Sequence, residues 1–354
     1  MNVDDVRRSI VHRLPPPVAR AARAAVHAVR SRRSSSDDGD FVYDASYFDG
    51  DGKQTPGGSG YGDYNRRTSH ADIAAYLLWR FLPFDRSLDV GCAKGFVVEA
   101  LCELGYDAHG CDISRYAIEG APPLVRPRLQ VVDLESPASR AQLAGDRFSL
   151  VTLFEVLEHL RPENVPDVLR FVRTISDGFV VATIPSIGRN PYGPDGFPNS
   201  KVRDERLAWY LEQGDDYLGP VPFDDLMRDR DGNPIEGHLT IASFAWWTRQ
   251  FEAAGFERVG AVEQAMHPII GRFDLSMAWN LYVFHVDDRP APPPLERTPV
   301  ELASVERRWQ LDEFDHVGQS VDYVRATMGD DAVAAIEAER VSAQERQRAF
   351  ESLL

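Results

Sequence analysis

Leu88-Asp89-Val90-Gly91-Cys92-Ala93-Lys94-Gly95-Phe96 is the stretch of sequence that decides the fold of this chain. An apolar strand runs here into a turn of small residues, and a helical pattern follows over residues 97–104. Such a turn brings bare backbone N–H groups and the N-terminus of a helix close to a bound ligand. A second apolar strand ends near Asp112, where a carboxylate can accept hydrogen bonds from ribose hydroxyls. The pattern indicates a strand–turn–helix–strand unit with a ribose-binding acid.

The turn differs from two common phosphate-binding motifs. The dinucleotide fingerprint G-x-G-x-x-G would need glycines at 91, 93 and 96, where the chain has Gly91, Ala93 and Phe96. A P-loop would need a G-K-[ST] sequence, which does not follow. The turn resembles motif I of the class I S-adenosylmethionine-dependent methyltransferases, D/E-x-G-x-G-x-G. Asp89, Gly91 and Gly95 match this motif, and Ala93 replaces its middle glycine.

Further apolar strands follow along the chain. They are expected at residues 128–134, from residue 148 onward, and at residues 178–185, 256–262 and 279–286. Such runs, separated by helical segments, indicate a parallel sheet covered on both faces. Their order resembles the same family, and the string E-V-L-E-H-L at residues 155–160 is typical of its small-molecule branch. The resemblance implies an α/β fold: a Rossmann-like, seven-stranded, mostly parallel sheet with helices on both faces and helical extensions at both ends.

Local signals predict where several helices begin and end. Apolar spacing predicts a helix over residues 70–82. Arg161-Pro162 is expected to open another helix, since proline is favoured in a first turn. Ser243 is the expected N-cap of a helix over residues 244–254.

The chain divides into four predicted regions. Residues 1–40 form a basic helical segment and a linker, and residues 41–286 form the methyltransferase-like domain. Within that domain, residues 185–237 are a long insertion after the fifth strand, where we expect substrate selection. Residues 287–299 are a proline-rich linker, and residues 300–354 are a helical region.

The resemblance implies S-adenosylmethionine as the cofactor. Asp112 would bind the ribose hydroxyls, and Asp133 would lie near the adenine amino group. The full set of implied cofactor-binding residues is Asp89, Gly91, Cys92, Ala93, Gly95, Asp112, Ile113, Asp133, Leu134, Phe154 and Tyr64.

Methyl transfer to a hydroxyl requires removal of a proton, and two histidines compete for this role. His159 follows the fourth strand, and His238 opens a later loop that is expected to face the same crevice. Imidazole has a suitable pKa for a general base. Glu155, at the end of the fourth strand, is expected to contact cofactor or substrate. His267 and His285 lie in or beside late strands and are interpreted as core residues.

A metal site is not predicted. The acids of the insertion lack a recognisable ligand spacing; they are Asp195, Asp224, Asp225 and Asp229. The three cysteines lie in the first strand–helix–strand unit, without zinc spacing, and are interpreted as reduced; they are Cys92, Cys102 and Cys111.

Composition limits the partners of the chain. The net charge of −16 argues against general nucleic-acid binding. Residues 1–33 contain eight arginines and suit contact with an anionic membrane surface or an acidic partner, or simply a solvated helix. Residues 300–354 suit homo-oligomerisation or coverage of the core. The sequence lacks an 18-residue apolar run and a secretory h-region, so a cytoplasmic location is expected. Abundant arginine and alanine are typical of a GC-rich, bacterial-like genome.

The leading functional hypothesis is O-methylation of a hydroxyl on a sugar, a glycoconjugate such as a glycolipid, or a secondary metabolite. N-methylation or carboxyl methylation is an alternative within the same family. A methyltransferase-fold subunit that binds partners without catalysis is a second alternative, and an NAD-dependent oxidoreductase is a third, disfavoured by the broken fingerprint.

Overall fold

The computed structural model describes residues 43, 45–49, 64–194, 202–203, 206, 209–210, 219–228, 234, 237–272 and 280–309. The predicted basic segment over residues 1–40 lies outside these residues, as does the C-terminal region from residue 310 on. In the part of the chain that is described, helices are too short or too polar to span a bilayer.

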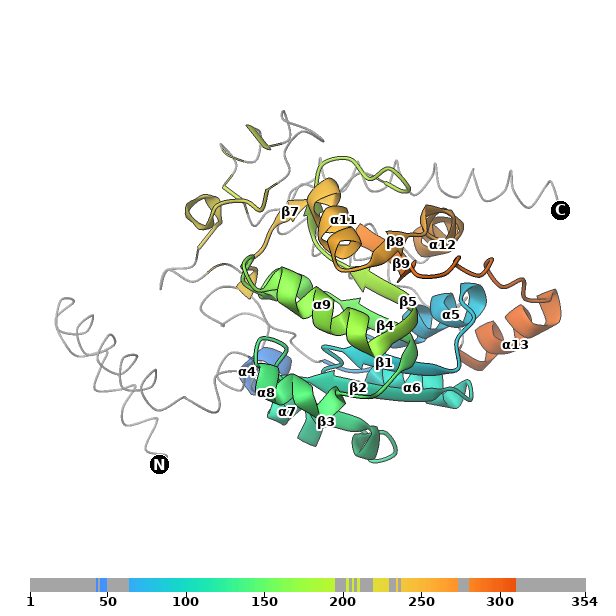
Figure 1. The fold of residues 1–354 in the computed structure, drawn as a ribbon. Helices are drawn as coiled ribbons and strands as arrows, with labels where there is room; N and C mark the ends of the chain where they lie inside the picture. The colour runs from blue at the N-terminus through green and yellow to red at the C-terminus, as the bar shows by residue number, and fades with distance from the viewer. Residues whose placement is uncertain are drawn as a thin grey trace, which may run out of the picture. The chain divides into compact units, whose positions relative to one another are not determined.

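Within the described residues, seven strands form one twisted sheet with the order β3-β2-β1-β4-β5-β9-β8 (Figure 1). Neighbouring strands from β3 to β5 pair in parallel, and β9 is antiparallel to both of its neighbours. The strands are β1 (Arg86–Val90), β2 (Asp107–Asp112), β3 (Leu129–Val131), β4 (Phe148–Phe154), β5 (Ser176–Thr183), β8 (Phe256–Arg258) and β9 (Leu281–Val286). This confirms the predicted Rossmann-like sheet.

Helices cover both faces of the sheet, each with its own apolar core (Figure 1). One face carries α5 (Ala71–Phe81), α6 (Phe96–Glu103), α7 (Arg115–Glu119), α12 (Gly260–Arg272) and α13 (Pro299–Trp309). The other carries α9 (Val165–Ile175) and α11 (Phe244–Ala253). The shorter elements are α4 (Ala45–Phe48), η1 (Arg126–Arg128), α8 (Pro137–Arg140), η2 (Ala141–Leu143), η3 (Leu157–His159), η5 (Phe223–Asp225) and a two-stranded sheet of β6 (Ser186–Ile187) with β7 (Ala242–Ser243).

Two of the predicted helix boundaries agree with the structure. The helix predicted over residues 70–82 is α5, which buries its apolar stripe against α6 and α12. Ser243 caps α11, because its Oγ accepts a hydrogen bond from the N–H of Trp246 at 3.1 Å.

The predicted start of α9 at Arg161-Pro162 is wrong. Residues 161–164 form a separate turn, closed by the N–H of Asn164 donating to the carbonyl of Arg161 at 2.9 Å. The helix begins at Val165, and Pro166 is the proline in its first turn. Two prolines four residues apart fit a first turn equally well, and the sequence signal does not distinguish them.

The sixth strand is shorter than predicted, and a helix that the sequence did not indicate follows it. Strand β8 ends at Arg258, and α12 begins two residues later at Gly260. A buried ion pair holds this bend: Arg258 Nη2 lies 2.8 Å from Glu263 Oε2, with both side chains at most 4% exposed. Glu263 Oε1 also accepts the N–H of Val283 at 2.9 Å. The second of these contacts joins Glu263 to a strand twenty residues away, and it favours a helix at residues 260–262, where a strand was predicted.

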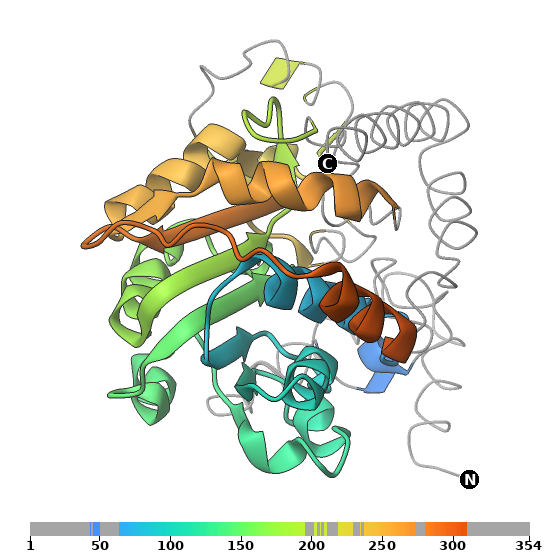
Figure 2. The ribbon, with the colours of Figure 1, turned by 90° about the vertical axis from the view of Figure 1, so that its right-hand side faces the viewer.

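The described part of the C-terminal region packs on its own chain. Helix α13 lies beside α5 (Figure 2). Tyr76 Oη donates to Glu306 Oε1 at 2.5 Å, and Trp309 Nε1 donates to Glu103 Oε2 at 3.2 Å. Residues 299–309 therefore cover the core, and self-association through residues 300–354 stays a prediction.

Candidate functional site

The turn after β1 has an alternating left-handed backbone. Gly91, Ala93 and Gly95 have φ angles of 73°, 48° and 75°. Ala93 adopts this conformation at a cost of about 1–2 kcal/mol, because its Cβ crowds the following carbonyl. A Cβ on Gly91 would lie 2.3 Å from Val156 Cγ2. The glycine at 91 is therefore required by both its conformation and its neighbour.

Replacing Gly91 by alanine is expected to lower the free energy of unfolding by about 1–3 kcal/mol through left-handed strain and overpacking. Gly105→Ala is the matched control, because Gly105 has φ 94° but a Cβ added there would meet no atom within 4 Å. Urea denaturation should show the larger loss for Gly91→Ala. Equal losses would mean that Val156 moves aside and only the backbone strain counts.

Asp112, at the end of β2, fastens the turn to the second strand. Its Oδ2 accepts the N–H of Ala93 at 2.8 Å, and its Oδ1 accepts the N–H of Ser114 at 2.7 Å. The N–H groups of Gly91 and Cys92 both donate to the carbonyl of Cys111, at 2.8 and 3.0 Å. Asp112 is buried, and its carboxylate holds the turn against the end of β2.

A cavity lies between the ends of β1 and β4. The chain leaves β1 toward β2 and β3 and returns at β4 on the opposite side, so this is the point at which strand order reverses. The cavity is lined by Tyr64, Thr68, Ser69, His70, Ala74, Leu77, Leu78, Asp89, Gly91, Cys92, Val97, Phe154, Glu155, Val181, Thr183, Met266, Ile270 and Leu281. Six predicted site residues are thus brought together, namely Tyr64, Asp89, Gly91, Cys92, Phe154 and Glu155.

The other predicted cofactor residues are not among those lining the cavity. Ala93, Gly95 and Asp112 lie in or beside the turn, and Ile113 follows Asp112. Asp133 and Leu134 lie beyond the end of β3: Asp133 Oδ1 accepts the N–H of Glu135 at 2.8 Å, and the Leu134 side chain belongs to the core. Their predicted contact with adenine stays a prediction.

Asp89 is buried at the base of the cavity. Its Oδ1 accepts a hydrogen bond from Thr152 Oγ1 at 2.6 Å, across the pairing of β1 with β4. Burial raises the pKa of Asp89 to about 7, although the Thr152 hydroxyl opposes this shift, and the nearby carboxylate of Asp112 adds to it. Near neutral pH this carboxyl is therefore divided between its protonated and ionised forms.

Glu155 has an unusual backbone for a side chain that lines a cavity. Its φ is 55°, and its N–H donates to the carbonyl of Thr183 at 2.9 Å. Non-glycine residues in this conformation are uncommon and are enriched at functional sites. The bend turns the chain out of β4 and into η3.

Two walls of the cavity were not predicted from the sequence. One wall is the turn before α5, with Thr68, Ser69 and His70, the last at φ 54°. The other is α12, with Met266 and Ile270. Histidine is one of several residue types enriched at left-handed positions, which is too weak a signal to place His70 in advance. The predicted strand over residues 256–262 overlaps only the first three residues of α12, and the sequence did not predict the rest of this helix.

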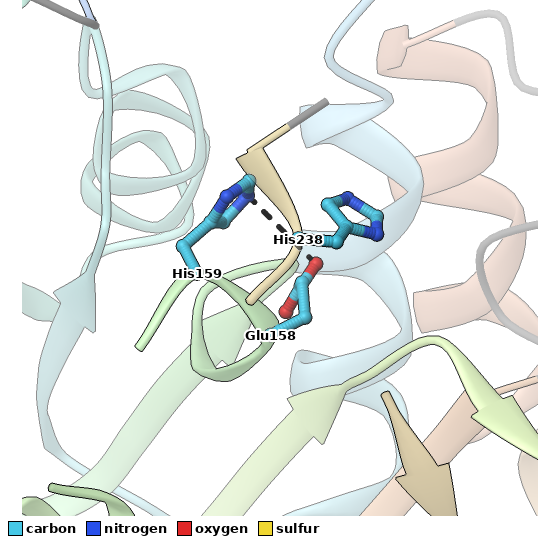
Figure 3. Close-up of side chains that lie close together, drawn as sticks. All are labelled: Glu158, His159 and His238. Carbon is cyan, nitrogen blue, oxygen red and sulfur yellow. Dashed lines mark ion pairs between the residues drawn. The ribbon is translucent and has the colours of Figure 1, made fainter. Parts of the chain in front are cut away.

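Glu158, His159 and His238 lie together beside this edge of the sheet (Figure 3). One ligand-type atom from each residue lies within 4.8 Å of the other two. The two imidazole rings meet edge to face, with centroids 5.1 Å apart. The two histidines predicted as rivals are therefore neighbours, and Glu158 is the third member of the cluster.

The histidines differ in their surroundings. His159 Nδ1 lies 3.2 Å from the carbonyl oxygen of Gly237, and burial lowers the pKa of His159 to about 4. The His238 side chain is buried. His285 lies in β9 against the ring of Phe179, as expected of a core residue, and burial lowers its pKa.

The acids considered for metal binding are occupied elsewhere. Asp225 is held by Arg203, Arg206 and Tyr210 at 2.5–3.2 Å, and these hydrogen bonds lower its pKa. The Asp224 side chain is 94% exposed and pairs with Arg228. Asp195 and Asp229 lie outside the described residues.

A family model described as a methyltransferase domain matches residues 63–260. A protein from Ruegeria pomeroyi named ubiquinone biosynthesis O-methyltransferase is 27% identical over 165 residues, which cover 43% of this chain and 61% of the relative. A protein of the same name from Ralstonia nicotianae is 28% identical over 218 residues, covering 59% of this chain and 78% of the relative. The chain thus spans about three fifths of the first relative's length.

Solved structures are similar at lower identity. One is the magnesium protoporphyrin IX methyltransferase from Synechocystis with bound S-adenosylmethionine. It is 13% identical, with a TM-score of 0.32, over 55% of this chain and 70% of that chain.

Proposed function

Because the chain belongs to the S-adenosylmethionine-dependent methyltransferases, we propose that it transfers a methyl group to a hydroxyl oxygen of a small molecule. The observation that carries the proposal is the pairing of a cavity at the β1–β4 switch point with the Glu158, His159 and His238 cluster at the same sheet edge. The names of the curated relatives support transfer to oxygen. Acceptors of the proposed class are sugars, glycoconjugates and secondary metabolites, including phenols.

The residues of the cavity fit a cofactor that carries positive charge. Asp89 and Glu155 supply carboxyl groups, and Tyr64 and Phe154 supply aromatic rings, which attract cations. The buried Thr183 Oγ1 lies in the lining and lacks a hydrogen-bond partner among the described residues. A polar group of the cofactor would satisfy this hydroxyl.

The cofactor supplies a methyl group on a sulfonium, and transfer forms the C–O bond as the C–S bond breaks. Asp112 would hold the ribose and the turn together, so that the methyl group is aligned with the acceptor. The hydroxyl proton must leave during this step, and the cluster of Glu158, His159 and His238 would receive it or favour its loss.

The alternatives make different demands on this site. An amine acceptor needs a weaker base, and a carboxylate acceptor needs none, so neither would require the histidine cluster. A non-catalytic subunit would not require a cavity that brings Asp89 and Glu155 together. The geometry therefore favours a hydroxyl acceptor.

Cofactor binding is the first test. Calorimetry is expected to show tight binding of S-adenosylhomocysteine and far weaker binding of NAD. Asp112→Ala should weaken the binding of S-adenosylhomocysteine by about 1–3 kcal/mol, because the N–H groups of Ala93 and Ser114 lose their acceptor. Asp107→Ala is the matched control, because Asp107 lies at the opposite end of β2 from Asp112 and pairs with Arg86 and Arg128. Tight NAD binding without S-adenosylhomocysteine binding would contradict the proposal.

Turnover is the second test. Labelled methyl donor is incubated with panels of sugars, glycolipids, phenols, amines and carboxylates, and transfer is expected only to hydroxyl-bearing acceptors. Transfer to an amine or a carboxylate alone would replace the O-methyl proposal. Cofactor binding without transfer to any panel would favour the non-catalytic alternative.

A further inference from the structure

We infer that Glu158, His159 and His238 form a binding site for one divalent transition-metal ion. The two imidazoles and one carboxylate come from two segments almost 80 residues apart, and their ligand atoms lie within 4.8 Å of one another (Figure 3). This departs from the metal-free site expected from the sequence, which considered only the acids of the insertion.

The backbone holds the two segments in register. The carbonyl of Glu158 accepts hydrogen bonds from the N–H groups of Leu239 and Thr240, at 2.7 and 2.9 Å. Thr240 Oγ1 donates to the carbonyl of Leu160 at 2.6 Å. The segment that carries His238 is thus fixed to the segment that carries the other two side chains, so the cluster does not depend on flexible side chains alone.

His159 is oriented as a ligand would be. Its Nδ1 lies 3.2 Å from the carbonyl oxygen of Gly237, where an N–H donates, and this leaves Nε2 as the nitrogen with a lone pair. Nε2 faces Glu158 Oε1 at 4.0 Å. Histidines that bind metals usually donate their other ring N–H to a carbonyl or carboxylate in this way.

The spacing suits an ion after a small side-chain adjustment. Ligand atoms about 2.0–2.2 Å from a tetrahedral ion lie roughly 3.3–3.6 Å apart. The 4.0 Å separation of Nε2 and Oε1 is too long for a hydrogen bond and slightly longer than this value. Binding would therefore draw the groups together by a fraction of an ångström at this pair.

Burial and chemistry indicate the kind of ion. The Glu158 side chain is 0% exposed and His238 is buried, so an ion here would be largely enclosed by protein. Two imidazole nitrogens favour an ion such as Zn²⁺, Co²⁺ or Fe²⁺ over Mg²⁺ and Ca²⁺, which prefer oxygen ligands. Three protein ligands leave a coordination position open for another molecule.

The role of the ion rests on the proposed function. An ion with an open position would bind the acceptor hydroxyl and lower its pKa, so that the proton leaves without an imidazole acting as the base. The two histidines would then act as ligands. Binding of the ion itself does not depend on which acceptor is used.

Metal content and Co²⁺ spectroscopy test the site on the full chain. The protein is stripped with a chelator, dialysed, and titrated with Zn²⁺ and Co²⁺, with metal content measured by mass spectrometry. We expect one ion per chain and visible Co²⁺ bands typical of four- or five-coordinate nitrogen and oxygen ligation. Failure of the stripped wild-type protein to bind one ion above background overturns the inference without any variant.

Variants locate the ion. Glu158→Gln and His238→Ala are expected to lower Zn²⁺ affinity by about 100-fold or more, since even indirect ligand partners change affinity by 10–100-fold. His109→Ala is the control, because His109 lies in β2 and pairs with Asp107. Unchanged affinity in folded Glu158→Gln and His238→Ala proteins, checked by circular dichroism, would place the ion elsewhere and overturn the inference.

Activity separates this inference from the proposed function. One ion bound at the cluster without methyl transfer would support the site and contradict the proposed reaction. Methyl transfer that persists in chelator-treated, metal-free protein would support the reaction and overturn a role for the ion. Loss of transfer on stripping, restored by one equivalent of Zn²⁺ or Co²⁺, would support both.

Discussion

His238→Ala is expected to transfer methyl groups about 10²–10⁴-fold more slowly than the wild-type chain, while its affinity for S-adenosylhomocysteine stays within about twofold. His238 lies with Glu158 and His159, at the edge where β4 ends and the acceptor would enter. It is not among the residues that line the cofactor cavity. Losing it should therefore affect turnover more than cofactor binding.

The measurement uses the acceptor found in the panel screen. Initial rates are compared for the wild type, His238→Ala and the His109→Ala control from pH 6 to 9. Equal rates for the wild type and His238→Ala at every pH would show that the proton leaves by another route. Glu155 would then be the next group to test. A rate loss that added divalent metal partly reverses would assign His238 as a ligand, and a loss that metal leaves unchanged would favour a base.

The central strands of the sheet could be predicted because they are apolar runs in the sequence. Strands β4 and β5 lie inside the sheet, and their mostly buried residues form almost continuous apolar sequence. The turn after β1 carries glycines where φ is positive. Ala93 shows the limit of such a motif, since alanine takes the left-handed position expected of glycine. Hydrogen bonding to Asp112 holds Ala93 there, and this contact joins two strands.

Elements that depend on distant partners were not predictable from local sequence. The start of α12 is one example, because Glu263 accepts a hydrogen bond from the backbone of β9, twenty residues further along the chain. The local sequence predicted a longer strand over residues 256–262 instead. One wall of the cavity was missed for the same reason.

The histidine cluster illustrates the same limit at the site. In the sequence alone, His159 and His238 are separate candidates for one role. Their juxtaposition with Glu158 comes from hydrogen bonds between segments almost 80 residues apart, which no periodicity encodes. The chemistry of a cluster differs from that of its members, and a metal site became apparent only with the fold.

Asp89 is expected to make the stability of this chain fall as pH rises from about 4 to 7. The native pKa of Asp89 is about 7, whereas an unfolded aspartate has a pKa of about 3.9. Between these values the native state keeps a proton that the unfolded state releases, so this group favours folding less with each pH unit. The contribution changes by up to about 1.4 kcal/mol per unit, or about 4 kcal/mol in all, and levels off above pH 7.

Asp89→Asn removes this contribution, because asparagine does not ionise and can still accept the hydrogen bond from Thr152. The free energies of unfolding in urea are measured for both proteins from pH 4 to 8.5. The variant should gain stability relative to the wild type as pH rises, and the gain should level off near pH 7. Subtracting the wild-type free energy of unfolding from that of the variant at each pH removes the contributions of the other titrating groups, which both proteins share. Parallel curves would mean that Asp89 ionises in the native state as it does in the unfolded chain.

A cationic cofactor beside Asp89 would favour the ionised form of this carboxyl group. The affinity for S-adenosylmethionine should therefore increase as pH rises through 7 in the wild type, and it should increase less in Asp89→Asn.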